Sequence, residues 1–347
     1  MSFKVSVQPA GQAFVAKPGQ TILDAALEAG IVLPYSCRNG TCSTCRGRVV
    51  TGDYEAGPAP GRVLDAADLA QGYTLLCQAC PTSDVTIEAE EVRMRGDIVV
   101  RKMPVRVHAL TPLATDVTEL TLQLPSAEAF NFQPGQYLDF LFKDGQRRSY
   151  SMACAQAQDH RVQLHLRHTP GGFFTDRVFG VGESPVKLRD ILRIEGPLGS
   201  FFLRDQPQPI VFLASGTGFA PIKAMIEAML VQGDVRPAVL YWGGRRPADL
   251  YQMDLPRAWA AQWPGFRFVP VLSDTQPEDA WRGRAGWVHQ AVMADFPDLS
   301  GHQVYACGAP AMVEAARHDF TRKCQLAPDM FYADAFTTEA DRAEAQA

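Results

Sequence analysis

The first part of the chain alternates hydrophobic and polar positions in short runs, interrupted by one helical stretch. Residues 3–7 alternate and predict a β-strand, with residues 12–16 as its hairpin partner. Residues 21–30 carry apolar side chains at helical spacing, and the first of them, Thr21, can cap the helix. Strands are expected again at residues 46–50 and 85–88. The pattern therefore predicts a helix that crosses a small mixed sheet.

The middle of the chain carries shorter strand patterns, separated by Pro and Gly turns. They fall at residues 104–110, 117–124, 137–142, 162–167 and 191–196. Together with a further strand around residue 150, this regular spacing predicts an antiparallel, six-stranded β-barrel.

The last third begins with a continuous apolar run at residues 209–214, as expected of a buried parallel strand. A glycine loop and a helical stretch to about residue 232 follow. Further strands are expected at residues 238–242, 266–272, 303–306 and 331–335. Strand, glycine loop and helix form the first unit of an α/β nucleotide-binding fold with a parallel sheet.

These patterns divide the chain into three domains. The first is expected at residues 1–93, followed by a charged, aperiodic linker at 94–103. The barrel is expected at residues 104–205 and the nucleotide-binding domain at 206–340. Residues 341–347 form an acidic, alanine-rich tail.

Composition narrows the class of protein. The 347 residues are 46% hydrophobic and 20% charged, which is ordinary for a globular protein. A net charge of −5 gives no indication of a nucleic-acid or membrane partner. We find no signal-peptide pattern and no apolar run long enough to span a bilayer. The eight cysteines form no disulfide framework, so a reducing cytoplasm is expected.

Four cysteines have ligand spacing. Cys37, Cys42 and Cys45 are separated by four and then two residues, and Cys77 follows after a short apolar run. This is the plant-type pattern for a 2Fe-2S cluster held by four thiolates. Zinc is the alternative, although structural zinc sites usually pair their ligands two by two. Cys80 is a second candidate for the fourth ligand. The domain resembles the β-grasp (α+β) fold of plant-type ferredoxins.

A tetrapeptide in the barrel, Arg148-Ser149-Tyr150-Ser151, resembles the Arg-x-Tyr-Ser flavin signature of ferredoxin–NADP reductase relatives. The resemblance implies that Arg148 pairs with the pyrophosphate of FAD and that Tyr150 lies against the isoalloxazine. It also implies that Ser151 hydrogen-bonds near the flavin N5. Alternating polar and aromatic residues also occur in barrel strands that bind nothing.

A second stretch of the barrel strengthens the flavin hypothesis. His165 and Arg167 precede a pair of glycines, Gly171 and Gly172, and Thr175 stands at the start of a short expected helix. Glycines that lead into a helix can form a backbone anion site for pyrophosphate. The alternative is an ordinary glycine turn with a solvated arginine.

The nucleotide-binding domain carries a glycine loop, Gly216-Thr217-Gly218, with Pro221 in the first turn of the following helix. Its two glycines let the backbone approach a diphosphate, and the third Rossmann glycine is absent. The loop resembles the Gly-Thr-Gly-x-Ala-Pro motif of the flavin reductase family. The alternative for each position is a structural turn.

Three further residues are candidates through the same resemblance. Cys307-Gly308 resembles the family's Cys-Gly-x-Pro loop, which places a thiol and bare backbone near the nicotinamide. Phe336 matches the aromatic residue that covers the flavin in relatives, although 11 residues follow it here. Buried structural roles are the alternatives for Cys307 and Phe336.

Asp274 follows an expected strand where NADPH-using relatives tend to carry arginine. It would repel a 2′-phosphate and predicts NADH as the coenzyme. Capping of a turn is its alternative role, and Arg245 and Arg246 are nearby positive charges.

Across nearly the whole chain, the domain order resembles the reductase components of phenol hydroxylase and benzoate dioxygenase. The CDP-6-deoxy-Δ3,4-glucoseen reductases have the same order and give the strongest resemblance. The resemblance implies an electron-transport oxidoreductase that passes electrons from NADH to FAD, to 2Fe-2S, and on to a dehydrase or oxygenase component. A carrier or scaffold that binds nucleotide without turnover is the rival.

Overall fold

The computed structural model describes residues 2–40, 42–58, 64, 66–89, 93–94, 98–126, 130–156, 159–182 and 184–337. The chain folds into two compact units. Unit 1 comprises residues 1–97, 199–201 and 333–347, and unit 2 comprises residues 98–198 and 202–332. The expected tail at 341–347 lies outside the described residues.

Unit 1 contains a five-stranded mixed sheet in the order β2-β1-β8-β4-β6. Its strands are β1 (Phe3–Gln8), β2 (Ala13–Ala16), β4 (Arg46–Thr51), β6 (Tyr73–Leu75) and β8 (Val85–Glu88). β1 pairs antiparallel with β2 and parallel with β8, which is the mixed pairing of a β-grasp sheet. The short elements are β3 (Ile31–Val32), β5 (Tyr54–Glu55), α2 (Ala66–Ala70), β7 (Cys80–Pro81) and β9 (Arg93–Met94).

The helix of unit 1, α1, spans Ile22–Glu28 and buries the apolar stripe seen in the sequence. The Thr21 hydroxyl accepts the backbone N–H of Asp24 at 3.1 Å, as a capping threonine should. The helix ends before the expected residue 30, because Gly30 adopts a left-handed φ of 77°. The expected helix over the sheet is therefore confirmed, with a shorter C-terminal end.

The segment expected to be a plain linker is partly strand. β9 pairs with β3 in unit 1, and the first barrel strand begins at Arg101. Aperiodic charged sequence gave no sign of β9, because a two-residue strand has no period to detect.

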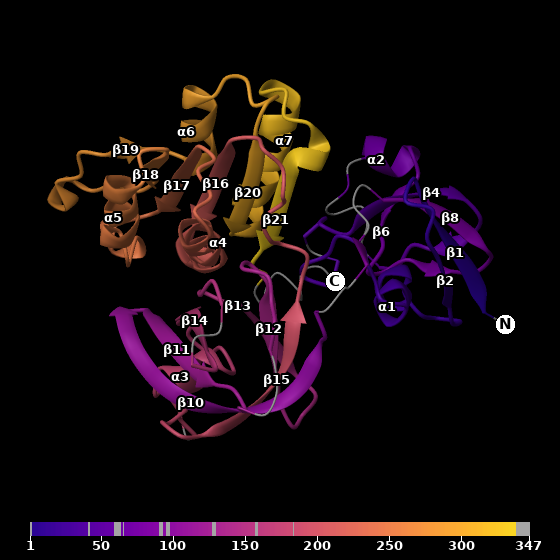
Figure 1. Ribbon diagram of the computed structural model, residues 1–347, viewed down its shortest axis with the longest axis horizontal. Coiled ribbons are helices and arrows are strands. Elements are labelled where there is room, and N and C mark those ends of the chain that lie inside the picture. The colour runs from indigo at the N-terminus through magenta and orange to yellow at the C-terminus, as the bar shows by residue number, and fades with distance from the viewer. Residues whose placement is uncertain are drawn as a thin grey trace. The chain divides into compact units, whose positions relative to one another are not determined.

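Unit 2 begins with a six-stranded antiparallel barrel in the order β13-β12-β15-β10-β11-β14 (Figure 1). Its strands are β10 (Arg101–Ala114), β11 (Val117–Gln123), β12 (Tyr137–Leu141), β13 (Arg147–Ser151), β14 (Arg161–Arg167) and β15 (Ile191–Leu198). A bridge between Met152 and Leu164 joins the two edges and closes the barrel. Leu120, Phe140 and Leu164 are fully buried in its interior.

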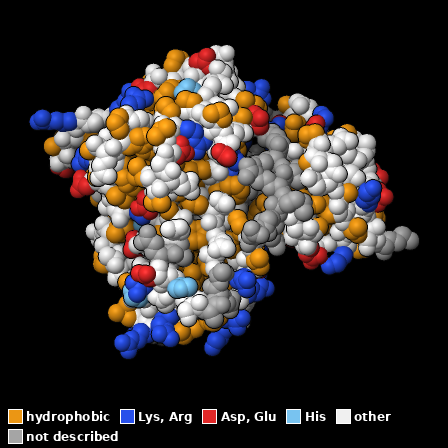
Figure 2. Space-filling model, in the orientation of Figure 1, with side chains coloured by type: hydrophobic (Ala, Val, Ile, Leu, Met, Phe, Trp, Pro, Cys, Tyr) orange, Lys and Arg blue, Asp and Glu red, His pale blue; other side chains and the backbone are white. Residues whose placement is uncertain are grey.

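The long strand β10 serves two neighbours in succession. Its first half, from Arg101 to Arg106, pairs with β15, and its second half pairs with β11 as far as Ala114. This double pairing explains why the strand extends beyond the expected residues 104–110. Its exposed positions include Arg101, Lys102 and Arg106, and basic side chains gather around the lower end of the barrel in Figure 2.

The rest of unit 2 is a six-stranded sheet in the order β19-β18-β17-β16-β20-β21. The strands are β16 (Ile210–Ser215), β17 (Ala238–Gly244), β18 (Phe266–Leu272), β19 (Arg284–Ala285), β20 (Gln303–Gly308) and β21 (Phe331–Ala335), the last of which ends in unit 1. The pairings of β19 with β18, β18 with β17, β17 with β16, and β16 with β20 are all parallel. The parallel α/β sheet expected from the sequence is therefore confirmed.

Helices accompany this sheet (Figure 1). They are α4 (Phe219–Gln232), α5 (Asp254–Gln262), α6 (Val288–Asp295) and α7 (Pro310–Lys323), while the barrel contributes α3 (Thr175–Val178). Helix α4 is buried over most of its length, which fits a helix covering a core strand. Short 3₁₀ turns are η2 (Gly216–Gly218), η3 (Pro247–Asp249), η4 (Pro277–Asp279) and η5 (Pro328–Met330). Among the described residues, no helix has the length and apolar character needed to cross a bilayer.

Candidate functional site

The cysteine loop lies between β3 and β4 and wraps tightly around its own sulfur atoms. The backbone N–H of Cys37 points to Cys42 Sγ at 3.5 Å, and that of Asn39 points to Cys37 Sγ at 3.5 Å. Arg38 and Ser43 adopt left-handed φ values of 57° and 51°, which non-glycine residues rarely take. Such strain is typical of a functional loop, and it turns backbone donors toward the thiols.

The four expected ligands form two pairs. The Cys37 thiol raises the pKa of Cys42 well above its usual range, and the Cys77 thiol does the same for Cys45, with burial adding to both. Two pairs of adjacent thiols fit a 2Fe-2S cluster, in which each iron takes two thiolates. When bound, the cluster carries electrons one at a time.

Cys80, the alternative fourth ligand, is placed differently. It belongs to β7, and its thiol lies 3.7 Å from the carbonyl oxygen of Gln78. Gln78 in turn supports the loop, since its side-chain amide donates to the Asn39 carbonyl at 3.2 Å. A Cβ at Gly40, whose φ is 85°, would clash with this amide, so the loop needs glycine there.

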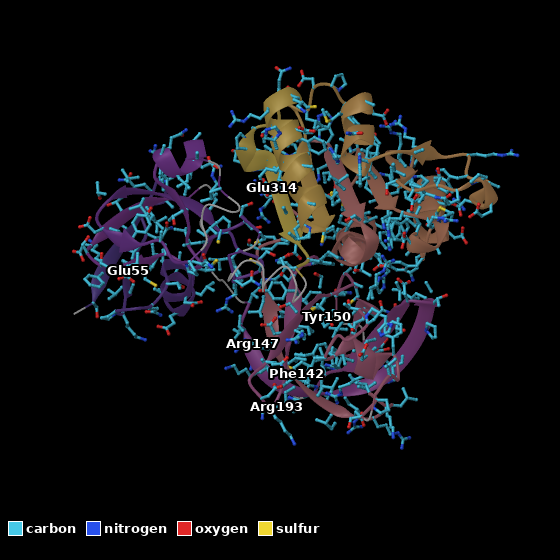
Figure 3. The ribbon with its side chains drawn as sticks, turned by 180° about the vertical axis from the view of Figure 1, so that it is seen from behind. Glu55, Phe142, Arg147, Tyr150, Arg193 and Glu314 are labelled. Carbon is cyan, nitrogen blue, oxygen red and sulfur yellow. The ribbon has the colours of Figure 1, made fainter. Side chains whose placement is uncertain are left out.

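In the barrel, successive residues of β13 point to opposite faces of the strand, so Arg148 and Tyr150 share one face. Tyr150 lies among aromatic rings, 5.9 Å from Phe140 and 5.8 Å from Phe174 between centroids. The Arg148 guanidinium lies 5.6 Å from the Phe173 ring. The guanidinium can donate hydrogen bonds to a pyrophosphate, and a neighbouring aromatic ring can pack against a flavin, so the two groups together fit FAD. Figure 3 shows Tyr150 near the upper end of the barrel and Arg193 at the lower end.

Ser149 points the other way along the same strand. Its hydroxyl donates to Asp139 at 2.6 Å, and Arg147 pairs with the same carboxylate at 3.4 Å. Arg147 also pairs with Glu195. The side chain of Ser149 is thus separated from those of Arg148 and Tyr150, while Ser151 is buried at the end of the strand.

The expected second flavin stretch divides into two places. His165 is fully buried, with Nδ1 2.9 Å from the Tyr251 hydroxyl and Nε2 3.6 Å from Glu119. Burial lowers the pKa of His165. Arg167 pairs with Asp116 at 3.1 Å and Asp249 at 3.3 Å.

Both residues therefore connect the barrel with the nucleotide-binding part of unit 2. The Arg167 Nη2 is buried, and it has no hydrogen-bond partner within the described ranges. A Cβ at Gly216 would lie 3.2 Å from Arg167 Nη1, so the guanidinium lies beside the glycine loop. An unpartnered guanidinium nitrogen there fits an anionic group of a bound cofactor.

The glycine pair and Thr175 form a self-contained turn. The Thr175 hydroxyl donates to the Thr169 carbonyl at 3.0 Å and accepts its N–H at 3.2 Å. The N–H of Gly171 donates to the Asp176 carboxylate at 3.2 Å. A Cβ at Gly172 would lie 2.8 Å from the Thr169 carbonyl, which explains that glycine sterically.

The loop after β16 is pressed against the end of β20. A Cβ at Gly218 would lie 2.7 Å from the Gly308 nitrogen, and a Cβ at Gly308, whose φ is 135°, would lie 2.6 Å from the Ser215 carbonyl. The sequence therefore brings Gly216, Thr217 and Gly218 beside Cys307 and Gly308, at the carboxyl ends of neighbouring parallel strands. Ligands of α/β sheets bind at such strand ends.

Helix α4 holds Pro221 in its first turn, where the missing N–H costs nothing. Phe219, the first residue of α4, stacks on Trp242 with 3.9 Å between centroids. Trp242 also donates to the Gly216 carbonyl at 3.0 Å, so the loop is supported from β17.

Asp274 is exposed just after β18. Its N–H donates to the Arg245 carbonyl at 3.1 Å, and its carboxylate accepts from the Gln276 side chain at 3.0 Å. Arg246 pairs with Asp279 at 2.8 Å and with Glu278 at 3.2 Å. The positive charge of Arg246 is therefore already balanced by carboxylates.

Phe336 is half-buried and belongs to unit 1, two residues beyond the buried Asp334. The unit that holds the cysteine loop therefore also holds this aromatic residue. The residues from 338 onward are outside the described part of the chain.

Several buried or half-buried polar residues at these places had no signal in the sequence. Glu119 and Tyr251 contact His165, and Lys223 donates from α4 to the Ala153 carbonyl at 2.7 Å. Each is a single polar residue inside an otherwise ordinary strand, helix or loop. Only the long-range packing of the barrel on the nucleotide-binding sheet reveals them.

Family models match the three domains in order. The 2Fe-2S iron-sulfur cluster binding domain matches residues 5–82, the oxidoreductase FAD-binding domain residues 104–203, and the oxidoreductase NAD-binding domain residues 212–318. The chain therefore carries domains for a 2Fe-2S cluster, FAD and NAD. The match favours iron and sulfide over the zinc alternative.

Relatives of similar length cover nearly the whole chain. A CDP-6-deoxy-L-threo-D-glycero-4-hexulose-3-dehydrase reductase from Yersinia pestis is 39% identical over 97% of this chain and 99% of its own. A terephthalate 1,2-dioxygenase reductase component from Comamonas is 36% identical over 97% and 98%. The crystal structure of an Amycolatopsis cytochrome P450 reductase, GcoB, has a TM-score of 0.75 at 35% identity, covering 97% of this chain and 99% of that one.

Proposed function

Because the chain belongs to the iron–sulfur flavoprotein reductases that join 2Fe-2S, FAD-binding and NAD-binding domains, we propose that it delivers electrons from NADH to a separate acceptor protein. The order is NADH, FAD, 2Fe-2S cluster and partner. The observation that carries this proposal is the presence of all three domains in one chain. FAD, when bound, exchanges electrons in pairs with NADH and singly with an iron–sulfur centre.

For the flavin, we propose that Arg148 holds the pyrophosphate and that Tyr150 supports the ring. A guanidinium makes charge-assisted, paired hydrogen bonds to phosphate oxygens, so Arg148 supplies most of the polar affinity. Ser151 orients the reactive edge of the ring and Phe336 covers it. The unpartnered Nη2 of Arg167 binds an anionic group of the cofactor. The buried side chain of His165 supports the site.

The turn that contains Gly171 and Gly172 offers fewer hydrogen-bonding groups to the flavin than the arginines do. The hydroxyl of Thr175 and the N–H of Gly171 already have partners within their own turn. Gly171, Gly172 and Thr175 therefore contribute through the shape of the turn and its remaining backbone donors. Ser149 contributes by fixing β13 through Asp139.

For the coenzyme, we propose that Gly216, Thr217 and Gly218 approach the diphosphate, with Pro221 starting the helix behind them. Cys307 and Gly308 form the wall beside the nicotinamide. The proximity of these two backbone segments supports this assignment. Asp274 selects NADH, since its carboxylate opposes a 2′-phosphate and can accept a hydrogen bond from a free 2′-hydroxyl.

The acceptor that we favour is a dehydrase acting on a CDP-linked 6-deoxy-hexulose. The 39% identity to the Yersinia reductase, over almost the full length of both chains, supports this choice. An oxygenase component is the second candidate, because a terephthalate dioxygenase reductase is 36% identical over a similar length. We place the reductase in the cytoplasm, where its eight cysteines, none of which forms a disulfide, would stay reduced.

The experiment is reconstitution with each acceptor. The reductase is mixed with NADH and either a CDP-hexulose dehydrase or a ring-hydroxylating oxygenase, and product is measured alongside NADH consumption. We expect coupled product formation with the dehydrase and uncoupled NADH oxidation with the oxygenase. The reverse result would assign the oxygenase pathway. Failure of NADH to bleach the flavin would refute the reductase function itself and favour a carrier or scaffold.

A further inference from the structure

The residues immediately before the cysteine loop are tied to chain segments from far along the sequence, all within unit 1. Tyr35 exchanges hydrogen bonds with Ser200: its N–H donates to Ser200 Oγ at 2.9 Å and its carbonyl accepts the Ser200 N–H at 3.2 Å. Its phenolic oxygen accepts the Gly199 N–H at 2.8 Å. Tyr35 and Ser200 are both buried, so water does not compete for these bonds.

A second tie joins the loop to the end of β21. The Ser36 hydroxyl donates to the Asp334 carboxylate, and both residues are only 5% exposed. The Thr44 hydroxyl lies 3.4 Å from the Ala333 carbonyl and 3.4 Å from the Cys42 carbonyl, and it can donate to either. Ser36 precedes the ligand Cys37, and Thr44 precedes the ligand Cys45. The two contacts therefore hold the loop near both of its ends.

The same short segment carries Phe336, two residues after Asp334. A buried carboxylate is a costly residue at a strand end unless hydrogen bonds compensate for its desolvation. The Asp334 carboxylate is buried beside the cysteine loop, where the Ser36 hydroxyl donates to it. One segment thus contacts the loop that holds the cluster and continues into the residue expected to cover the flavin.

We propose that Asp334 is a positioning residue for the one-electron step: by binding Ser36, it fixes the cluster loop relative to the segment that bears Phe336. The proposal rests on the electron order given above. Transfer between two centres depends on their separation and orientation, so a loosened loop slows the step without altering either centre. Hydride transfer from NADH to the flavin does not involve this contact.

The test compares two rates in the full-length holoenzyme. Rapid mixing with NADH under anaerobic conditions gives the rate of flavin bleaching and the later rate of cluster reduction. We expect Asp334→Ala to slow cluster reduction about tenfold or more and to leave flavin bleaching within about twofold. Asp334→Asn keeps an acceptor oxygen for Ser36 and should retain most of the rate. Asp329→Asn, at an exposed residue of η5, is the matched control.

Two further readouts separate positioning from a general structural role. Iron content and the electron paramagnetic resonance spectrum of the reduced cluster should match the parent in Asp334→Ala. Amide hydrogen exchange should increase in the peptide around Tyr35 and Ser36. Equal slowing of both rates, or unchanged cluster reduction, would overturn the proposal.

If Asp334→Ala loses its iron, the smaller change Ser36→Ala decides. Slowed cluster reduction with full iron supports positioning, and loss of iron there too assigns the contact to folding and overturns the proposal. A parent protein whose flavin never reduces its cluster would instead refute the proposed electron order. The two failures are therefore distinguishable.

Discussion

The imidazole of His165 and the phenol of Tyr251 meet edge to face, with Nδ1 2.9 Å from the hydroxyl oxygen and 5.5 Å between ring centroids. The first residue belongs to the barrel strand β14 and the second follows η3 of the nucleotide-binding part. Glu119 and Lys223 are the charged groups that influence this histidine. The contact is thus a buried, titratable link inside unit 2.

This link predicts a pH-dependent stability. Burial lowers the pKa of His165 below its ordinary value, which is about 6.5. The unfolded chain therefore takes up a proton before the folded protein does. The stabilisation is complete above about pH 6.5 and is lost as the pH falls from there toward the lower folded pKa.

We expect the thermal midpoint of unit 2 to decrease as the pH is lowered from about 7.5 to about 5.5. Release of the flavin on heating serves as the readout. The range stays above the titration of Glu119, whose pKa the His165 contact lowers. His165→Asn should flatten this acid slope, whereas His108→Asn, at an exposed histidine of β10, should keep it. Equal slopes in all three proteins would contradict the assignment.

Replacing Cys45 with Ser should abolish the cluster while sparing the flavin. Cys45 is a buried member of the Cys45–Cys77 pair, and a serine hydroxyl does not replace a thiolate as a soft ligand. Iron analysis and visible absorbance should show the loss, and NADH should still bleach the flavin.

Cys80→Ser is the matched control for this change and should retain its iron, because Cys80 belongs to β7 and its thiol contacts the Gln78 carbonyl. Loss of iron in Cys80→Ser with retention in Cys77→Ser would exchange their roles. Zinc in place of iron after anaerobic reconstitution would refute the cluster itself.

Flavin retention should depend on Arg148 more than on Tyr150. A charge-assisted contact with pyrophosphate contributes about 1.5–3 kcal/mol, so Arg148→Ala should weaken FAD binding about tenfold or more. Tyr150→Ala should retain more flavin, because its ring contributes mainly contact area. FAD content after gel filtration measures both.

Arg147→Ala provides the control for the Arg148 variant. Arg147 lies on the same strand, but it pairs with Asp139 and Glu195 on the opposite side from Tyr150. Its loss should leave FAD content close to that of the parent. Similar flavin loss in the two arginine variants would argue against the proposed pyrophosphate position.

Coenzyme preference should shift when Asp274 becomes Arg. The parent should prefer NADH, and the variant should gain at least about tenfold in kcat/KM for NADPH, equivalent to about 1.4 kcal/mol. Arg246 does not already supply that charge freely, since Asp279 and Glu278 pair with it.

The same charge change at Asp254→Arg, on the exposed start of α5, should leave the NADH-to-NADPH ratio unchanged. An unchanged ratio in Asp274→Arg would show that Asp274 does not select the coenzyme. Its role would then be to stabilise the turn through its hydrogen bond with Gln276.

Local pattern was enough to predict the architecture. Alternation placed β1 and the barrel strands, and the apolar run from Ile210 identified the central parallel strand β16. Cysteine spacing likewise identified the four thiols, three in the loop and Cys77 after β6, that form two pairs in the folded unit. Each of these signals lies within a short stretch of chain, where period and spacing are readable.

The remainder depends on contacts between distant residues. Nothing near Tyr35 announces Ser200, which is 165 positions away, and nothing near Arg167 announces Asp249. The motif also includes Ser149, and only the fold shows that its hydroxyl donates to Asp139. Side-chain partners of this kind follow from packing, which a linear pattern does not encode.

The composition of unit 1 bears on how such reductases can be recombined. Cutting the chain after residue 97 would separate the ferredoxin portion from Gly199–Phe201 and from the segment that begins at Ala333. The excised piece would leave the Tyr35 N–H and the Ser36 hydroxyl without the acceptors that they use in the whole chain. A chimaera that exchanges ferredoxin modules between reductases therefore needs to carry over Gly199–Phe201 and the segment that begins at Ala333, or to rebuild their contacts in the recipient.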